Sequence, residues 1–172
     1  MPVLESKEIY DTRKVQIIRD FFVQHQDKIL SLRFGGEDLS SSLGLKRACE
    51  DILYDFYPIK HLLSSLVLQF KPYGFNITAA VFTCFKNDEG LIKELQEDLK
   101  MGLFGKTVIH PKQVAIVHKA YAVSQVEWEQ AQQVNDKDAK AIISSEGSML
   151  ESIPHRRWAK QILQREKLYG II

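Results

Sequence analysis

The stretch GLFGKTVIHP, residues 102–111, decides how the fold of this chain is interpreted. Its Gly105-Lys106-Thr107 is similar to the end of a phosphate-binding P-loop. A P-loop needs its first glycine at residue 100, and that residue is Lys100. A P-loop also follows a strand and opens a helix, whereas here a predicted helix precedes Gly105 and a predicted strand follows Lys106. The stretch therefore predicts the end of a helix and the start of a strand, and the nucleotide-site hypothesis is rejected.

The composition is that of an ordinary globular domain. Of the 172 residues, 45% are hydrophobic and 26% are charged, and the formal net charge is +1. So small a charge gives no global field that would attract nucleic acid or an anionic membrane. No apolar run approaches the ~20 residues of a membrane-spanning helix, and the first residues lack the basic and apolar regions of a signal peptide. We expect no nucleic-acid partner, no membrane partner and a cytoplasmic location.

The two cysteines support the same location. Cys49 and Cys84 are far apart in the sequence and form no CxxC pair. This pattern fits a protein of the reducing cytosol and argues against a structural zinc site.

Working outward from residues 102–111, short strands alternate with helices. Strands are expected at residues 1–5, 29–34, 76–85 and 107–109. Helices are expected at 11–26, 59–70 and 88–99 and from Pro111 onward, followed by a helix that Ser124 and Glu127 cap and by a basic helix over 154–167. This order indicates a parallel α/β architecture. Four βα units are half of a (β/α)8 TIM barrel, and a doubly wound open sheet is the alternative.

Four segments of the chain resemble, in the same order, the citrate lyase β-subunit-like family of the HpcH/HpaI aldolase superfamily. They are MPVLES (1–6), LRFGGEDLSSSLG (32–44), GLFGKTVIHPKQVAIVHKAY (102–121) and GSMLESIPHRRWAKQIL (147–163). The branch of C–C bond lyases associated with tellurium-resistance operons is the most similar. The resemblance implies that residues 1–138 are the C-terminal half of a TIM-barrel lyase domain. It also implies that residues 139–172 form a C-terminal helical extension that reaches a neighbouring subunit.

The resemblance assigns roles to five residues. It implies that Glu5 and Asp38, each following a predicted strand, jointly bind Mg²⁺, and that the backbone near Gly36 and Glu37 holds a substrate carboxylate. It implies that Glu151, which stands where the family has an aspartate, supplies acid/base chemistry to a neighbouring subunit's site. An arginine that holds substrate oxygens in relatives would lie in the unmatched half, and no residue here is assigned its role.

Structural interpretations stand beside these functional ones. Asp38 could instead cap the helix after the loop, and structural roles are favoured for Lys106 and His110. The function that the resemblance implies is Mg²⁺-dependent cleavage of a carbon–carbon bond in a hydroxy acid or its acyl-CoA thioester, carried out by a homo-oligomer. The alternative is a catalytically inactive, truncated barrel that acts as an assembly or partner subunit.

Overall fold

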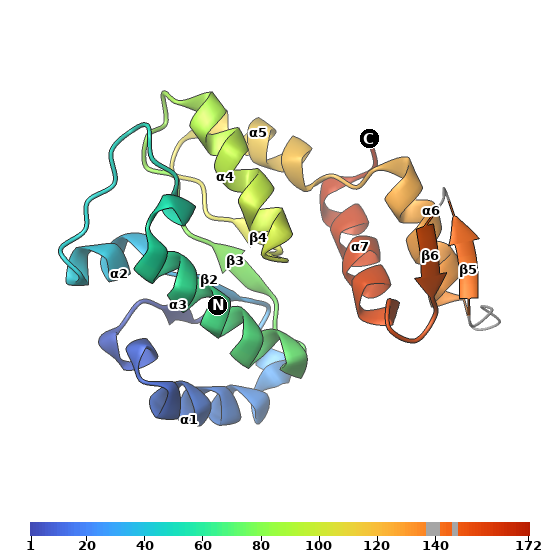
Figure 1. Cartoon of the computed structure of the whole chain (residues 1–172), viewed down its shortest axis with the longest axis horizontal. Coiled ribbons are helices and arrows are strands. Elements are labelled where there is room, and N and C mark those ends of the chain that lie inside the picture. The colour runs from blue at the N-terminus through green and yellow to red at the C-terminus, as the bar shows by residue number, and fades with distance from the viewer. Residues whose placement is uncertain (137–141, 146–147) are drawn as a thin grey trace. The chain divides into compact units, whose positions relative to one another are not determined.

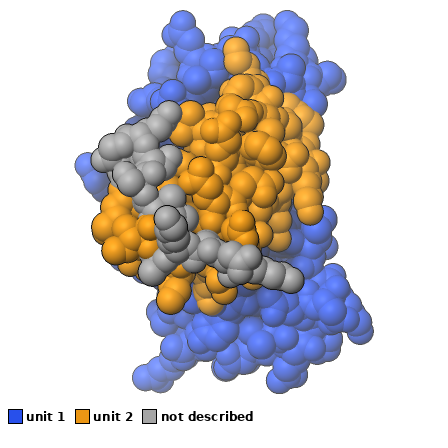
Figure 2. All heavy atoms as spheres, turned by 90° about the vertical axis from the view of Figure 1, so that its right-hand side faces the viewer, with its two compact units in different colours: residues 1–117 blue, residues 118–172 orange. Residues whose placement is uncertain are grey.

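The computed structural model describes residues 1–136, 142–145 and 148–172 (Figure 1). The strands are β1 (Val3–Leu4), β2 (Leu32–Phe34), β3 (Ile77–Ala79), β4 (Gly105–Lys106), β5 (Ile142–Ser145) and β6 (Ser148–Glu151). The α-helices are α1 (Thr12–Val23), α2 (Gly36–Ser42), α3 (Tyr57–Phe70), α4 (Asp88–Lys100), α5 (Pro111–Tyr121), α6 (Gln125–Asn135) and α7 (Arg156–Tyr169). The chain divides into two compact units, Met1–Val117 and His118–Ile172, which Figure 2 shows in blue and orange.

The first unit contains a parallel sheet whose strands follow one another in chain order, β1-β2-β3-β4. A doubly wound sheet reverses its strand order at a switch point, and this sheet has no reversal. Right-handed crossovers between successive parallel strands then place the connecting helices on one face of the sheet. The arrangement is that of half a (β/α)8 barrel, which confirms the predicted fold class.

The strands alternate between the helix layer and the opposite face of the sheet. Leu32, Phe34 and Ile77 are buried. Arg33, which lies between Leu32 and Phe34, and Thr78, which follows Ile77, are half-exposed. Strand register aligns Val3 with Arg33, Arg33 with Thr78 and Thr78 with Gly105. These residues form one row on the face away from the helices, because successive side chains in a strand point to opposite faces. In a barrel, this row faces the interior.

Local signals set most helix boundaries as predicted. The side chain of Asp11 accepts a hydrogen bond from the backbone of Arg13 at the start of α1. Ser124 and Glu127 form a capping box at the start of α6. α4 begins at Asp88 as expected, and the side chain of Asn87 before it caps the helix by accepting from the backbone of Gly90. A side chain at this position satisfies a backbone N–H that the helix itself leaves without a partner.

The predicted strand at residues 107–109 is wrong. The strand is Gly105–Lys106, flanked by ladder bonds from Phe104 N–H to the carbonyl of Ile77 (2.9 Å) and from Thr107 N–H to that of Ala79 (3.3 Å). The apolar residues that follow belong to the turn before α5. The β5–β6 hairpin was not predicted either.

The two cysteines are joined, which corrects their interpretation as typical of a reducing environment. Cys49 follows α2 and Cys84 follows β3, and the fold brings their Cα atoms to 5.2 Å in a disulfide. Spacing along the sequence could not exclude this bond, since the chain folds back on itself across the sequence separation of 35. In the described part of the chain, no helix is long and apolar enough to cross a membrane.

The second unit has a core of its own. Buried residues from α6, α7 and β6 pack together and are covered by Trp128 and Trp158: they are Ala131, Val134, Leu150, Ala159 and Ile162. This cluster explains why α6 belongs with the C-terminal residues. The division at Val117 precedes the boundary expected at residue 138, which lies outside the described residues. The expected domain boundaries, and an extension that reaches a neighbouring subunit, stay predictions.

Candidate functional site

Glu5 lies at the C-terminal end of β1, beside the turn that follows β2. The amide of Gly35 donates to the carbonyl of Leu4 at 3.0 Å, which holds the two strand ends together. A Cβ atom at position 35 would lie 2.3 Å from Glu5 Cβ and 3.1 Å from Glu5 Oε2. Gly35 has a φ of −89°, so the glycine is needed for space and not for its backbone conformation. The glycine therefore leaves room for the Glu5 side chain.

Asp38 lies in the first turn of α2, which begins directly after the β2 turn. Gly35 occupies the N-cap position and no side chain caps the helix, so the interpretation of Asp38 as a helix cap is wrong. A Cβ at Gly36 would lie 2.8 Å from Ala80 Cβ, so α2 starts in close contact with the end of β3. The Asp38 side chain is exposed and available for another role.

A small recess of ≈60 Å³ lies at these strand ends. Its lining comes from the ends of β2 and β3, the first turn of α2 and the residue after β4: Arg33, Phe34, Gly35, Gly36, Glu37, Asp38, Val81 and Thr107. A recess of this size accepts a few water-sized groups, so a larger ligand must extend beyond it. The C-terminal ends of the strands are where TIM barrels carry their active sites.

The donor set at this edge suits a hard cation. Glu5 and Asp38 supply exposed carboxylates, and the described residues contain no group of three or more His, Cys, Asp or Glu side chains placed to hold a metal. Mg²⁺ is commonly bound by one or two carboxylates, with waters and substrate oxygens filling its other positions. The residues present therefore fit Mg²⁺, and the gap that Gly35 leaves beside Glu5 gives the carboxylate room to turn.

Glu37 leads from the recess into a network of buried charges. Its carboxylate accepts from Arg47 Nη2 at 2.5 Å, and Arg47 Nη1 donates to Glu94 Oε2 at 2.6 Å. Arg47 also donates to the carbonyl of Val81, which lines the recess, at 2.7 Å. Because the Arg47 side chain is only 3% exposed, these bonds hold the first turn of α2 against α4 and the end of β3. Glu37 is thus an anchored neighbour of the recess.

Lys106 closes the inner end of the same network. Its ammonium group lies 2.7 Å from Glu94 Oε1 and 2.9 Å from Asp98 Oδ2, with all three side chains no more than 1% exposed. Burial raises the pKa of Asp98, while Lys106 and a hydrogen bond from Tyr54 oppose that rise. Lys106, the lysine of the P-loop-like segment, therefore forms ion pairs with carboxylates of the protein itself, and its predicted structural role is confirmed.

The Ile-His-Pro-x-Gln part of the motif has a structural function as well. Gln113 is buried, accepts from the amide of Ile109 at 3.0 Å and donates to the carbonyl of Phe82 at 2.8 Å. His110 stacks on Phe85 and accepts from the amide of Lys112 through Nδ1 at 3.2 Å. The structural role predicted for His110 is confirmed, and Gln113 joins the start of α5 to the segment after β3.

Glu151 lies in the second unit, at the end of β6. Its strand pairs with β5 in antiparallel register, Glu151 opposite Ile142. Its amide donates to His155 Nδ1 at 3.0 Å, and its side chain is half-buried. Glu5, Asp38, Gly36 and Glu37 all lie in the first unit. The catalytic role of Glu151 stays a prediction.

Sequence reasoning missed four residues near the site, and two signals could have revealed three of them. Glu94 and Asp98 share a helix face with Leu91 and Leu95, and a carboxylate on an apolar face needs a buried partner. Arg33 interrupts an otherwise apolar strand, Leu32 to Phe34. The fourth residue, Arg47, lies in an irregular segment with no pattern that would mark it.

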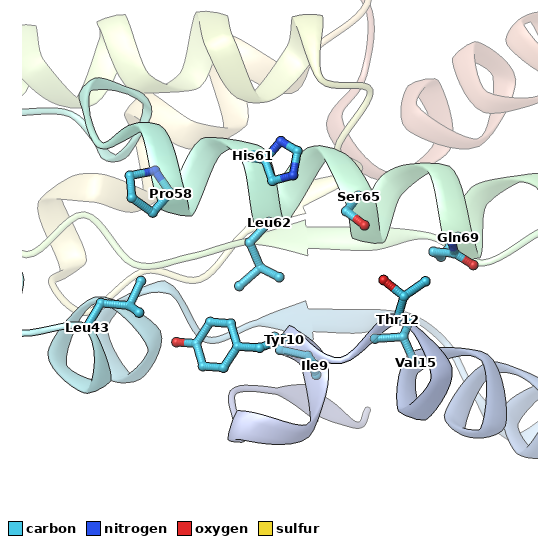
Figure 3. A pocket seen from close by; sticks show the side chains of 10 residues that line it. All are labelled: Ile9, Tyr10, Thr12, Val15, Leu43, Pro58, His61, Leu62, Ser65 and Gln69. Carbon is cyan, nitrogen blue, oxygen red and sulfur yellow. The ribbon is translucent and has the colours of Figure 1, made fainter.

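A second hollow, of about 270 Å³, lies within the helix layer between α3 and the segment that leads into α1. Figure 3 shows Leu62 pointing from α3 toward Tyr10 on the opposite wall. Tyr10 donates through its hydroxyl to the carbonyl of Leu39 at 3.1 Å. The lining holds no carboxylate and no residue of the predicted site, so we assign it no part in the chemistry.

Comparison with known proteins agrees with this fold. A family described as "C-C_Bond_Lyase of the TIM-Barrel fold" matches residues 1–171. The mitochondrial citramalyl-CoA lyase of Rattus norvegicus is 28% identical over 138 residues, which are 76% of this chain and 38% of the relative. The citrate lyase subunit beta of Haemophilus influenzae is 26% identical over 146 residues, which are 81% of this chain and 48% of the relative.

Solved structures show the same architecture. The protein CitE of Mycobacterium tuberculosis, in complex with magnesium, acetoacetate and coenzyme A, is 26% identical and has a TM-score of 0.58. The match covers 79% of this chain and 51% of CitE. A citrate lyase from Burkholderia xenovorans, 15% identical over 99% of this chain and 53% of its own, has a TM-score of 0.68 and shows the fold alone. The chain spans about half the length of the solved structures, and less of the curated relatives, that it matches.

The chain belongs to the C–C bond lyase family of the TIM-barrel fold. This membership confirms the predicted resemblance to the citrate lyase β-subunit-like proteins.

Proposed function

We propose that this chain carries the metal-binding half of a Mg²⁺-dependent carbon–carbon bond lyase, with Glu5 and Asp38 as the metal ligands. One observation supports it above the others. Gly35, which directly precedes the helix that carries Asp38, is fixed against the Leu4–Glu5 strand end at the C-terminal edge of the sheet. The magnesium, acetoacetate and coenzyme A bound by CitE of Mycobacterium tuberculosis favour the same chemistry. The substrate class is a hydroxy acid or its acyl-CoA thioester.

The chemistry proposed is an aldol- or Claisen-type cleavage. A base removes the hydroxyl proton, the carbon–carbon bond breaks to leave a carbonyl compound, and the electron pair passes to the departing carbon as an enolate, which then takes up a proton. Mg²⁺ supplies stabilisation of the negative charge that develops on oxygen. The amides of Gly36 and Glu37 are proposed to hold the substrate carboxylate, and Glu151 of a neighbouring chain is proposed to move the proton.

The sheet supports an assembly. Within the described residues, β1 pairs with β2 and β4 pairs with β3, and the outer edges of β1 and β4 carry no further strand. Open strand edges pair readily with another chain, so we propose that the chain works as a homo-oligomer. A cytoplasmic location and the association with tellurium-resistance operons stay predictions, and the cysteines no longer support that location.

Calorimetric titration of Mg²⁺ tests the proposal. The wild type is expected to bind in the micromolar to millimolar range, and Asp38→Asn is expected to lose binding because the amide removes the negative charge that the ion requires. Asp88→Asn is the matched control, since Asp88 also lies exposed in the first turn of a helix. Equal binding by wild type and Asp38→Asn would contradict the assignment.

One alternative function follows from the open sheet. A half barrel without activity would serve as an assembly or partner subunit. It predicts a defined oligomer by light scattering together with no Mg²⁺ affinity and no turnover. Mg²⁺ binding that depends on Asp38 would rule it out.

A further inference from the structure

We propose that Arg33 is the side chain that binds the substrate's carboxylate together with the amides of Gly36 and Glu37, and that Glu5 holds its guanidinium group until a metal ion takes Glu5 as a ligand. The inference rests on the proposed lyase function and names the group that recognises the substrate. The amides of Gly36 and Glu37 are backbone donors without charge, and Arg33 adds the charged side chain that would share this role with them.

The position of Arg33 in the sheet is the first argument. It lies in the middle of β2 between the buried Leu32 and Phe34, so its side chain points to the face away from the helices. Thr78 lies beside it in the neighbouring strand. Of the described residues that line the recess at the strand ends, Arg33 carries the one positive charge, and it shares that lining with Asp38.

The contact with Glu5 is the second argument. Arg33 Nη2 lies 3.7 Å from Glu5 Oε2, and the two side chains are 35% and 43% exposed. This distance exceeds that of a hydrogen bond, and an ion pair so exposed is weak. Arg47, by contrast, is buried and donates to two carboxylates and a carbonyl. Arg33 is therefore the arginine at this edge that can leave its present partner with only a small loss of free energy.

The chemistry of the two groups then gives a sequence of events. A divalent cation and a guanidinium group compete for the same carboxylate oxygens of Glu5. When the cation binds, the planar guanidinium loses its partner and presents paired N–H donors that match a carboxylate. A hydroxy acid, and an acyl thioester that retains one free carboxylate, both offer that group next to the metal.

This exchange predicts two changes of opposite sign in Arg33→Gln. Mg²⁺ binding tightens by about two- to fivefold, because a weak exposed ion pair no longer competes for Glu5. Binding of L-malate, used as the hydroxy-acid probe at saturating Mg²⁺, weakens by about tenfold or more, because a charge-assisted hydrogen-bond pair is lost. Arg33→Lys, which keeps the charge without the planar fork, restores part of the malate affinity.

Isothermal calorimetry on the folded variants measures both changes, with Arg13→Gln as the matched control because Arg13 is exposed on α1. Equal malate affinity in wild type and Arg33→Gln would overturn the proposal. So would weaker Mg²⁺ binding in Arg33→Gln, since Arg33 would then support Glu5 instead of competing for it.

A metal-free arm separates this inference from the proposed function. If the wild type binds no Mg²⁺, the lyase proposal fails, but Glu5→Gln still frees the guanidinium group. In the presence of EDTA, Glu5→Gln is expected to bind malate about tenfold or more tightly than Glu5→Gln/Arg33→Gln. Equally weak binding by these two variants would overturn the role of Arg33 without any reference to the metal.

Discussion

Replacing Lys106 by methionine tests whether the buried charges beside the recess hold the first unit together. The ammonium group lies between Glu94 and Asp98, at 2.7 and 2.9 Å, and its side chain is 1% exposed. Removing one partner of a buried ion pair leaves a charge without compensation and costs about 3–5 kcal/mol. Asp98 loses its cation here, whereas Glu94 keeps its ion pair with Arg47, so we expect the free energy of unfolding to fall by about the lower figure.

Lys100→Met is the matched control. Lys100 lies 2.6 Å from Glu97 on α4, but its side chain is 70% exposed, and exposed pairs contribute about 0–1 kcal/mol. The two substitutions are chemically identical and differ mainly in burial. Urea unfolding followed by far-UV circular dichroism measures both. Fluorescence of Trp128 and Trp158 reports separately on the second unit, which contains both tryptophans of the chain.

The loss in Lys106→Met should also depend on pH. Burial raises the pKa of Asp98 and Lys106 opposes that rise, so the variant raises this pKa further. A carboxyl whose pKa is higher folded than unfolded contributes stability at pH below its unfolded value, and loses that contribution as pH rises through the folded value. The deficit relative to wild type should therefore shrink in mildly acidic solution and be largest in mildly alkaline solution. A deficit no larger than that of Lys100→Met, or one independent of pH, would refute the reasoning.

Two further predictions concern the surroundings of the site. The variant Cys49→Ser/Cys84→Ser should lose about 3–4.7 kcal/mol of stability in urea unfolding, because the bond closes a loop across a sequence separation of 35; a dithiol reductant should lower the stability of the wild type by a similar amount and leave the variant unchanged. Gly35→Ala should lose about 1–3 kcal/mol from overpacking and weaken Mg²⁺ binding in calorimetry, since the new Cβ would lie 2.3 Å from Glu5 Cβ; unchanged Mg²⁺ affinity would show that Glu5 is not a ligand.

Much of the fold was predictable because its signals are local. The caps at Asp11 and Ser124 act within three residues along the chain, and the apolar spacing of residues 59–70 marks α3 without reference to any other element. The order of strands and helices then indicates a parallel sheet, because two neighbouring parallel strands must be joined by a long crossover, which is usually a helix. The strand at 107–109 was misplaced because Thr107, Val108 and Ile109 favour a strand, whereas the ladder to β3 ends at Thr107.

The residues of the candidate site also fall into those that local sequence reveals and those that depend on partners far away in the chain. Glu5 and Asp38 could be singled out because each stands next to the end of a strand in a recognisable segment. Arg47 could not, because its acceptors Glu37 and Glu94 are 10 and 47 residues away in the sequence. The Glu151 carboxylate was identified by its segment alone, and its partners in space are not predictable from that segment.

The sequence by itself determined the order of elements, the parallel βα pattern, the family and the two carboxylates at the strand ends, because each of these depends on residues close together in the chain. Only the tertiary structure decided that Cys49 bonds to Cys84, that Lys106 neutralises Glu94 and Asp98, and that Arg33 lies beside Glu5. These pairs form when the chain folds back on itself. Burial then decides which charges are fixed in the interior and which, like Arg33, stay accessible to a ligand.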